Sequence, residues 1–212
     1  ADLFAATGYN YGATPTGGYH MNIGTDNIQA TGTAGPCVAC HMGIDSADHS
    51  WDVVALDETT GDITAVNSNA CVNCHSYDPL NPAAFIAELN EAKHEFHAAL
   101  DNLKYALAQN GFFFAPSYPY FFTSQAAADA GDRTAGVKDW TAGGTLNGKD
   151  AMGAAYNYNL FDHDPGAYAH NSIYALTLIA DSIDFLADGF VDGSGVFNID
   201  GVDTDLAAAA LG

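Results

Sequence analysis

The chain has 212 residues, with 26 Asp or Glu against 5 Lys or Arg, and its formal net charge is −21 at pH 7. A surface this acidic repels nucleic acid and anionic lipid, so neither is expected as a partner. The length suits one or two small domains, and no apolar run is long enough to insert into a membrane as a helix. A chain so acidic and poor in Lys suits a saline or extracellular setting, where salt screens its self-repulsion.

Two copies of one short motif use all four cysteines of the chain. In C-x-x-C-H, two thiols separated by two residues can reach the two vinyl groups of one porphyrin, and the adjacent His lies under the iron as its proximal ligand. Two such matches predict two covalently attached c-type haems. The motifs are Cys37-Val38-Ala39-Cys40-His41 and Cys71-Val72-Asn73-Cys74-His75.

The same thiols have an alternative interpretation as a zinc site or a redox dithiol, because two C-x-x-C pairs can bind one zinc ion. Zinc does not require a His directly after each pair. The repeated His therefore favours haem over zinc.

Covalent haem attachment also bears on location, because it takes place outside the cytoplasm. The first residue is Ala and no charged-then-apolar leader precedes it. We therefore expect a periplasmic or extracellular protein in its mature form, after cleavage of a signal.

The first half of the chain predicts an irregular arm, a hairpin and a long helix. Residues 1–36 are rich in Gly, Thr, Tyr and Asn and show little periodicity. The β-prone runs Trp51–Leu56 and Ile63–Val66 flank a Thr-Thr-Gly-Asp turn and predict a small β-hairpin between the two haem motifs. An Asn-Pro start and an Asn-Gly end predict an amphipathic helix over about residues 82–109. Its apolar stripe consists of Phe85, Leu89, Phe96, Leu100, Leu103 and Leu107.

The second half predicts aromatic and loop-rich segments before a second helix. The aromatic block at 112–122 predicts irregular structure packed on something flat and apolar, and residues 123–150 predict Gly-rich loops. Asp164-Pro165 predicts a helix start with an acidic N-cap, and Gly189 predicts its end. This helix is apolar on most of its circumference, so we expect it to be largely buried. The fold expected is mainly α with much irregular structure and a small β-hairpin, divided at residue 80 into parts 1–80 and 81–212 that pack as one compact unit.

Two haems with His41 and His75 as proximal ligands need two distal ligands, or one if an iron stays open for chemistry. On a helical wheel, His94 falls nearly opposite the apolar stripe of the first helix and His97 falls on its flank, so a solvated helix face is favoured for both. His170 heads the polar stripe of the second helix, and periodicity alone does not bury it. The six other histidines are His20, His49, His94, His97, His163 and His170.

Methionine offers another kind of distal ligand. Met21 and Met152 could bind iron and would raise its potential. Histidine is in such excess over the sites to be filled that two bis-His haems are favoured.

Three segments of the C-terminal half resemble multihaem c-type cytochromes, and in particular the extracellular electron-transfer cytochromes of metal-reducing microbes, some of which polymerise into conductive filaments. The resemblance implies a haem-packed multihaem cytochrome c architecture. The segments are Met152-Gly153-Ala154-Ala155-Tyr156-Asn157-Tyr158-Asn159-Leu160, His163-Asp164-Pro165-Gly166-Ala167-Tyr168-Ala169-His170-Asn171 and Asp181-Ser182-Ile183-Asp184-Phe185-Leu186.

The same resemblance nominates three distal iron ligands. The His-Asn pair in a helix is similar to the distal-ligand helix of octahaem and pentahaem cytochromes and implies His170. The pattern Cys-His-Met followed by His-Ser-Trp implies His49, and Tyr-His-Met upstream of the first motif implies His20 as a weaker match. The resembling cytochromes usually carry four or more haems where this chain has two motifs. Two alternatives follow for the surplus histidines: some have no iron to bind, or a histidine binds a haem of a neighbouring subunit.

Together, motif and resemblance imply a dihaem cytochrome that carries electrons, as the subunit of an extracellular conductive filament. The partners implied are other redox proteins or an extracellular acceptor, and further copies of the chain. One alternative is a monomeric periplasmic shuttle. Another is a small haem enzyme of the peroxidase or nitrite/hydroxylamine type, which needs one open iron with acid–base groups beside it. No spacing in the sequence requires such a site, so no enzymatic activity and no catalytic residue is predicted.

Overall fold

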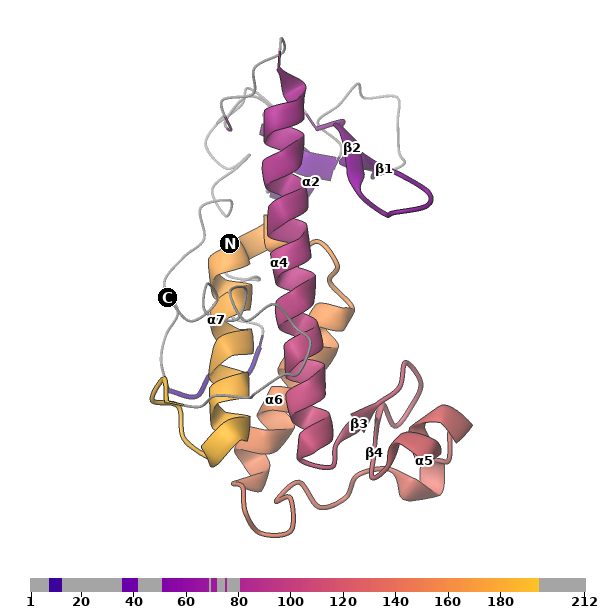
Figure 1. Cartoon of the computed structure of the whole chain (residues 1–212), viewed down its shortest axis with the longest axis vertical. Helices are drawn as coiled ribbons and strands as arrows, with labels where there is room; N and C mark the ends of the chain where they lie inside the picture. The colour runs from indigo at the N-terminus through magenta and orange to yellow at the C-terminus, as the bar shows by residue number, and fades with distance from the viewer. Residues whose placement is uncertain are drawn as a thin grey trace.

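A computed structural model gives the structure of the chain, and it describes residues 8–12, 36–41, 51–68, 70–71, 75 and 81–194. One long helix runs the length of this part, with two shorter helices beside one half of it and a β-hairpin beside the other half (Figure 1). The elements are α2 (Pro36–His41), β1 (Val54–Leu56), β2 (Ile63–Val66), α4 (Pro82–Gln109), β3 (Phe113–Phe114), β4 (Phe121–Phe122), α5 (Gln125–Ala130), the 3₁₀ turn η3 (Arg133–Ala135), α6 (Gly148–Asp162) and α7 (Ala167–Asp188). The mainly helical class with a small hairpin, expected from the sequence, is confirmed.

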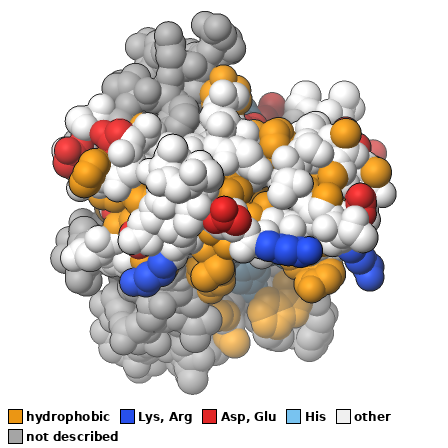
Figure 2. All heavy atoms as spheres, turned by 90° about the horizontal axis from the view of Figure 1, so that it is seen from below, with side chains coloured by type: hydrophobic (Ala, Val, Ile, Leu, Met, Phe, Trp, Pro, Cys, Tyr) orange, Lys and Arg blue, Asp and Glu red, His pale blue; other side chains and the backbone are white. Residues whose placement is uncertain are grey.

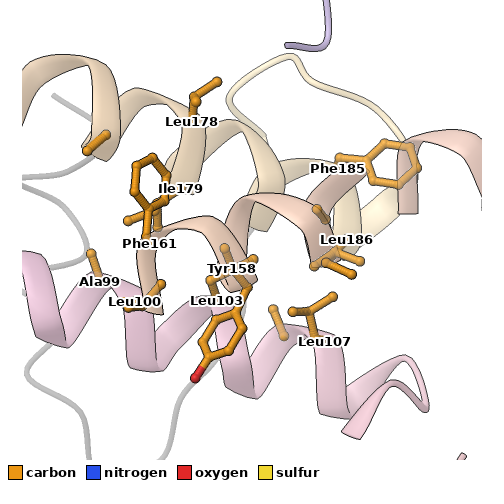
Figure 3. Packing of buried hydrophobic residues seen from close by; sticks show 14 of the residues in the cluster. Ala99, Leu100, Leu103, Leu107, Tyr158, Phe161, Leu178, Ile179, Phe185 and Leu186 are labelled. Carbon is orange, nitrogen blue, oxygen red and sulfur yellow. The ribbon is translucent and has the colours of Figure 1, made fainter. Parts of the chain in front are cut away.

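The core lies where α4, α6 and α7 meet (Figure 3). The second half of α4 faces α7 on one side and α6 on another, and apolar side chains of all three helices interdigitate. Phe96, Leu103 and Leu107 of α4 and Leu178 and Ile179 of α7 are fully buried. Burial of side chains of this size contributes about 1.5–3 kcal/mol each, so this three-helix core is the main source of stability in the described part.

Helix α4 has the bounds that its sequence predicts, Pro82–Gln109. Pro82 occupies the first turn, and Gly111 at φ +83° lies just past the C-terminal end, in a conformation that costs Gly little. One expectation is wrong in detail, because the side chain of Asn81 makes no capping hydrogen bond. Burial of the periodic apolar stripe therefore stabilises the helix, and the N-cap side chain contributes little.

Helix α6 lies in a stretch for which the sequence predicted no helix. The first half of its core face is made of small residues, Ala151, Gly153, Ala154 and Ala155, which give little periodic hydrophobic signal but allow close approach, and Tyr158 and Phe161 follow on the second half. Asn147 caps the helix by accepting a hydrogen bond from the Lys149 N–H at 3.0 Å. The region 123–150, expected to be loops, also contains the short elements α5 and η3.

Helix α7 begins later than expected and is broken near its start. Its N-cap is Gly166, so the prediction of Asp164 as an acidic cap is wrong. Asn171 has non-helical angles, and its Oδ1 accepts a hydrogen bond from the Tyr174 N–H at 3.3 Å. Asn171 thus caps the long second part of α7, and one turn, 167–170, is left in front of it. Gly189 ends the helix at φ +91°, as predicted.

The polar stripe expected on α7 is partly buried. Asp184 is only 3% exposed, and its Oδ2 accepts hydrogen bonds from the backbone N–H groups of Asp192 and Gly193, both at 2.7 Å. A carboxylate that accepts two backbone N–H groups can be buried at acceptable cost. Asp184 therefore fixes the chain after α7.

The β-hairpin is present where the sequence predicts it, with Val54 opposite Val66, and it is fastened to α4. Asn90 of α4 accepts a hydrogen bond from the Ile63 N–H at 2.7 Å and donates one to the Ile63 carbonyl at 3.0 Å. Lys93 donates to the Gly61 carbonyl in the turn. These bonds cross the boundary at residue 80 that the sequence suggested, and the division into 1–80 and 81–212 stays a prediction.

Residues 8–12 of the expected irregular arm lie against α6 and α7. Asn157 on α6 donates to the Tyr9 carbonyl at 2.9 Å and to Ser182 Oγ at 3.0 Å, and accepts the Tyr9 N–H at 2.5 Å. The Tyr9 ring covers Gly153, where a Cβ would lie 2.1 Å from a ring carbon. Tyr11 stacks on Phe185 with ring centroids 5.3 Å apart. This segment is therefore part of the core end of the molecule.

The aromatic block forms a two-stranded β3–β4 pair instead of wholly irregular structure. Cationic side chains lie over aromatic rings at this end: Lys104 over Phe114 at 5.8 Å and Arg133 over Tyr118 at 5.9 Å. Figure 2 shows this end from below, with blue cationic side chains beside orange apolar ones. The few cations of an acidic chain thus lie mostly at the end away from α2 and the hairpin.

Candidate functional site

The first of the two Cys-x-x-Cys-His motifs lies beside the N-terminal half of α4 (Figure 1). The first forms α2, which places Cys37, Cys40 and His41 on one short helix. In the second motif, the His75 N–H donates to the Cys71 carbonyl at 3.0 Å. Cys40 packs against the buried Ala70, one residue before the second motif. The described parts of both motifs therefore belong to one site.

His41 is oriented by the chain that follows the first motif. Its Nδ1 lies 2.8 Å from the Trp51 carbonyl oxygen, and its ring lies 5.7 Å from the Trp51 ring. A ligating His normally donates its second ring N–H to a carbonyl or carboxylate, which fixes the tautomer that binds metal through the other nitrogen. His41 thus has the hydrogen bond expected of a proximal ligand that binds through Nε2.

The fold brings His170 to His41 across 129 residues of sequence, with ring centroids 6.2 Å apart and planes inclined at 51°. His170 stands on the single turn 167–170, before the break at Asn171. Its Nδ1 lies 2.9 and 3.0 Å from the two carboxylate oxygens of Asp164. The two imidazoles therefore lie near one another, each with its Nδ1 atom engaged on a separate partner.

This separation fits two axial ligands of one iron. Metal–imidazole bonds of about 2.0 Å on opposite faces place the two ring centroids roughly 6 Å apart. His41 and His170 could thus hold a haem attached through Cys37 and Cys40, with both iron positions filled by nitrogen. Such an iron exchanges electrons without offering a position for substrate.

The second motif has an aromatic environment. His75 stacks on Phe85 of α4 with ring centroids 5.3 Å apart and planes inclined at 25°. Burial, and to a smaller extent the negative charge of the Cys71 thiolate, raises the pKa of Tyr168 on the first turn of α7. Cys71 thus lies near the turn of α7 that carries His170.

A small cavity of about 30 Å³ lies beside His170, between the end of α6 and the start of α7. Its lining combines Asp164, His170 and Asn171 with the apolar residues Phe161 and Ala175. A polar cavity of this size has room for water, which would add to the hydrogen bonding around the imidazole.

The remaining histidines of the described part lie elsewhere. His94 is exposed, as predicted, and its Nε2 lies 2.9 Å from Asp62 Oδ1 on the hairpin. His97 is half-buried against Phe96, and this burial lowers its pKa, so the solvated face expected for it is wrong. His163 is exposed at the end of α6, with its Nδ1 2.8 Å from the Asn159 carbonyl. Cys74, His49 and His20, all predicted site residues, lie outside the described residues.

Within the described part, no group of three or more His, Cys, Asp or Glu side chains is arranged to hold a metal ion. The site offers a pair of facing imidazoles instead. An iron held between them would need the four nitrogens of a porphyrin to complete its coordination. The donor set therefore fits haem.

Comparison with known proteins gives three similar sequences. The chain is 42% identical over 209 residues to the C-type polyheme cytochrome OmcB of Geobacter sulfurreducens, in two strains, and 41% identical over 209 residues to OmcC of the same species. The chain is homologous to these multihaem c-type cytochromes. The resemblance inferred from the sequence motifs is therefore confirmed.

These alignments cover 93% of this chain but only 27% of OmcB and 26% of OmcC. The chain thus spans about a quarter of the length of the curated relatives it matches. No protein-family model and no solved structure matches it. The names of the relatives designate c-type polyheme cytochromes.

Among the helices that the structure describes, none is long and apolar enough to cross a membrane.

Two residues of the site were missed or misread from the sequence. Asp164 was read as a helix cap, and in the structure its carboxylate holds His170. Asn171 was read as half of a family motif, and it restarts the helix after the turn that carries His170. An Asp six residues before a His, separated by Pro-Gly, was the available signal.

Proposed function

We propose that the chain is a c-type cytochrome that transfers electrons through two covalently attached haems. The first would be bound by Cys37 and Cys40, with His41 and His170 as its axial ligands. The 6.2 Å approach of these two imidazoles is the observation that carries the proposal. The homology to polyheme cytochromes supports covalently bound haem independently.

The second haem would be bound by Cys71 and Cys74, with His75 as its proximal ligand. The stacking of His75 on Phe85 supports this assignment, because an apolar ring wall suits a haem pocket. His49 and His20 stay the candidates for its distal ligand. The contact between Cys40 and Ala70 supports two haems close together, as electron exchange between them requires.

Haem count and iron coordination test the proposal together. The full chain, exported in a host that attaches c-type haem, is expected to give two haems per chain in a pyridine haemochrome assay. Both haems should be six-coordinate and low-spin in electron paramagnetic resonance. His170→Ala should convert one of the two to a high-spin signal. A high-spin haem in the unaltered chain, or an unchanged spectrum after the substitution, would contradict the proposed ligands.

The finer part of the proposal is that an exported homopolymer of this chain forms an extracellular electron conduit, which passes electrons to other redox proteins or to an extracellular acceptor. Large apolar side chains at the surface support self-association, among them Tyr118 at 66% and Phe190 at 68% exposure. The cations lie mainly at the end away from the haem motifs, which suits contact with an acidic region of the next copy in a head-to-tail array. Electron microscopy of native material should show filaments. If the protein stays monomeric at every salt concentration, the filament proposal is wrong and a monomeric electron shuttle is the better description.

A further inference from the structure

The loop between α6 and α7 places a carboxylate on the imidazole of His170. Asp164 Oδ1 and Oδ2 lie 2.9 and 3.0 Å from His170 Nδ1, so the N–H is shared between both oxygens. The two side chains are 30% and 33% exposed, which removes part of the water that would otherwise screen the interaction. The contact is therefore stronger than an ion pair on an open surface.

The backbone holds the two side chains in this position. The Asp164 N–H donates to the Phe161 carbonyl at 3.2 Å, and the Asp164 carbonyl accepts the Ala167 N–H at 3.0 Å. The His170 N–H donates to the Gly166 carbonyl at 3.0 Å. One short hydrogen-bonded stretch thus carries both the acid and the imidazole.

Gly166 forms the other side of this arrangement. A Cβ at Gly166 would lie 3.1 Å from His170 Cε1 and 3.4 Å from Nε2. The imidazole is therefore confined by the Asp164 carboxylate at Nδ1 and by the Gly166 backbone near Nε2. Little freedom of ring rotation is left, because the ring is held at Nδ1 and has Gly166 beside its Cε1 edge.

We infer that Asp164 is the positioning residue of His170, and that its carboxylate lowers the reduction potential of the haem held between His41 and His170. This inference rests on the ligand pair of the proposed function. A neutral imidazole that binds iron through Nε2 carries its proton on Nδ1, and an acceptor there fixes the tautomer and raises the basicity of Nε2.

The two axial ligands differ in this respect. The acceptor at His41 is the neutral carbonyl of Trp51, whereas the acceptor at His170 is a carboxylate. A more basic, more negative ligand stabilises ferric over ferrous iron, because the ferric centre carries one more positive charge. The carboxylate acceptor at His170 should therefore give this haem a lower reduction potential than it would have with carbonyl acceptors at both histidines.

The test is a redox titration of the full haem-loaded chain with Asp164→Asn, which keeps the shape of the side chain and an oxygen acceptor but removes the charge. Loss of an outer-shell partner changes the metal-binding strength of its ligand by about 10–100-fold. A tenfold loss of preference for ferric iron corresponds to an upward shift of about 59 mV for a one-electron couple. We expect an upward shift of about this size in one of the two couples, because the ferric state loses more from removal of the carboxylate charge than the ferrous state does, with the low-spin spectrum retained.

Two further variants make the outcome specific. Asp162→Asn removes the same charge two residues away. The Asp162 carboxylate lies 3.3 Å from the Tyr158 hydroxyl and not beside an iron ligand, so this variant should leave both couples nearly unchanged. Asp164→Glu keeps the negative charge, so its potential should lie much closer to that of the unaltered chain than the potential of Asp164→Asn does. If Asp164→Asn shifts neither couple more than Asp162→Asn does, the inference is wrong.

The proposed function fails separately from this inference. His170→Ala identifies the haem concerned, because that haem becomes high-spin. If His170→Ala changes one haem and Asp164→Asn does not, the ligand pair stands and the role of Asp164 is overturned. If His170→Ala changes neither, the ligand pair is overturned with it. If Asp164→Asn does not fold, the potential of the Asp164→Glu variant decides: the inference requires it to stay close to the original value.

Discussion

The two halves of α4 are held in place by different means. The C-terminal half contributes Phe96, Leu103 and Leu107 to a continuous apolar core with α6 and α7. The N-terminal half meets the hairpin and the two motifs through separate polar and aromatic contacts. Among the described residues of that half, the apolar cluster beside the motifs is no larger than Ala70 with Cys40 packed against it.

The difference indicates how each half obtains its stability. Apolar burial contributes roughly 25 cal/mol per Å² removed from water, and the three-helix end has this burial from its own side chains. The motif end has little of it from side chains in the described part. Two porphyrins would supply flat apolar surface there. We therefore expect the core end to withstand loss of haem and the motif end to depend on it.

The largest effect on the difference between the core end and the motif end should come from removing a pair of haem-binding cysteines. In the double variant Cys37→Ser and Cys40→Ser, we expect one haem per chain in place of two, since both thioether bonds of the first site are lost. Limited proteolysis should then cut within the motif end, which includes the N-terminal half of α4, and spare the core end from Phe96 to residue 194. The variant Cys71→Ser with Cys74→Ser is the matched control for the other haem. An unchanged haem count in either variant would exclude covalent attachment at that motif.

The next largest effect should come from the opposite end. Phe96→Ala removes a side chain with 0% exposure and should lower the free energy of unfolding by about 3–5 kcal/mol, through lost transfer energy and a residual cavity. Urea unfolding followed by circular dichroism measures it. Tyr105→Ala, on the same helix and 38% exposed, should cost about 1 kcal/mol or less. Equal losses would show that the core does not dominate stability.

A smaller and more local effect is expected where the hairpin joins α4. Asn90→Ala removes both hydrogen bonds to Ile63, whose backbone groups lie in a buried position, and should cost about 1–3 kcal/mol. Hydrogen exchange should show faster exchange in Ile63–Val66 than in the α6–α7 core. The control Asn81→Ala, on a residue without a side-chain cap bond, should change neither quantity. Equal exchange rates in the two regions would contradict a separately fastened hairpin.

The smallest effect concerns pH. Burial first, and then the neighbouring Lys93 cation, lower the pKa of His97 in the folded chain. The unfolded chain, with an ordinary His pKa of about 6.5, then binds more protons, so stability is full above that pH and falls as the pH drops through it. The variant His97→Gln cannot take up this proton and should lose less stability between pH 7 and pH 5. Parallel urea midpoints for both proteins over this range would rule out a buried His97.

The sequence was most informative where one side of an element is apolar and the other polar. The stripe that runs from Phe85 to Leu107 has the helical period, and α4 has the predicted bounds. The hairpin was predictable because β-prone runs flank a turn whose Asp57 accepts hydrogen bonds from the Thr59 and Thr60 N–H groups at 2.9 and 2.8 Å. In both elements, local signals and tertiary packing point to the same structure.

Helix α6 could not be predicted in this way, because the first half of its buried face is made of Ala and Gly. Such residues pack by allowing close approach, and Gly153 lies under the Tyr9 ring for this reason. The partner that makes Gly153 useful comes from the other end of the chain. Only the tertiary structure shows that Tyr9 packs on Gly153.

The candidate site was predictable in its chemistry and only partly in its arrangement. The motif spacing gave the cysteines and the proximal histidines, and resemblance nominated His170, whose ring lies 6.2 Å from that of His41. The partner of His170 was misassigned, because an Asp before Pro is also a common helix cap. Whether a carboxylate caps a helix or holds an imidazole depends on where the chain places the His. His49 and His20 stay predictions.

The docking of residues 8–12 on α6 and α7 also determines the order in which the molecule can form. Tyr9 contacts Asn157, which lies 148 residues further along the chain. This contact closes a very long loop at a large cost in conformational entropy, so we expect it to form late in folding. A chain made from its N-terminus presents both Cys-x-x-Cys-His motifs before α6 and α7 exist. The thiols are thus accessible on a chain that has not yet closed, and the N-terminal tyrosines join the core after the cysteines have already passed through that open state.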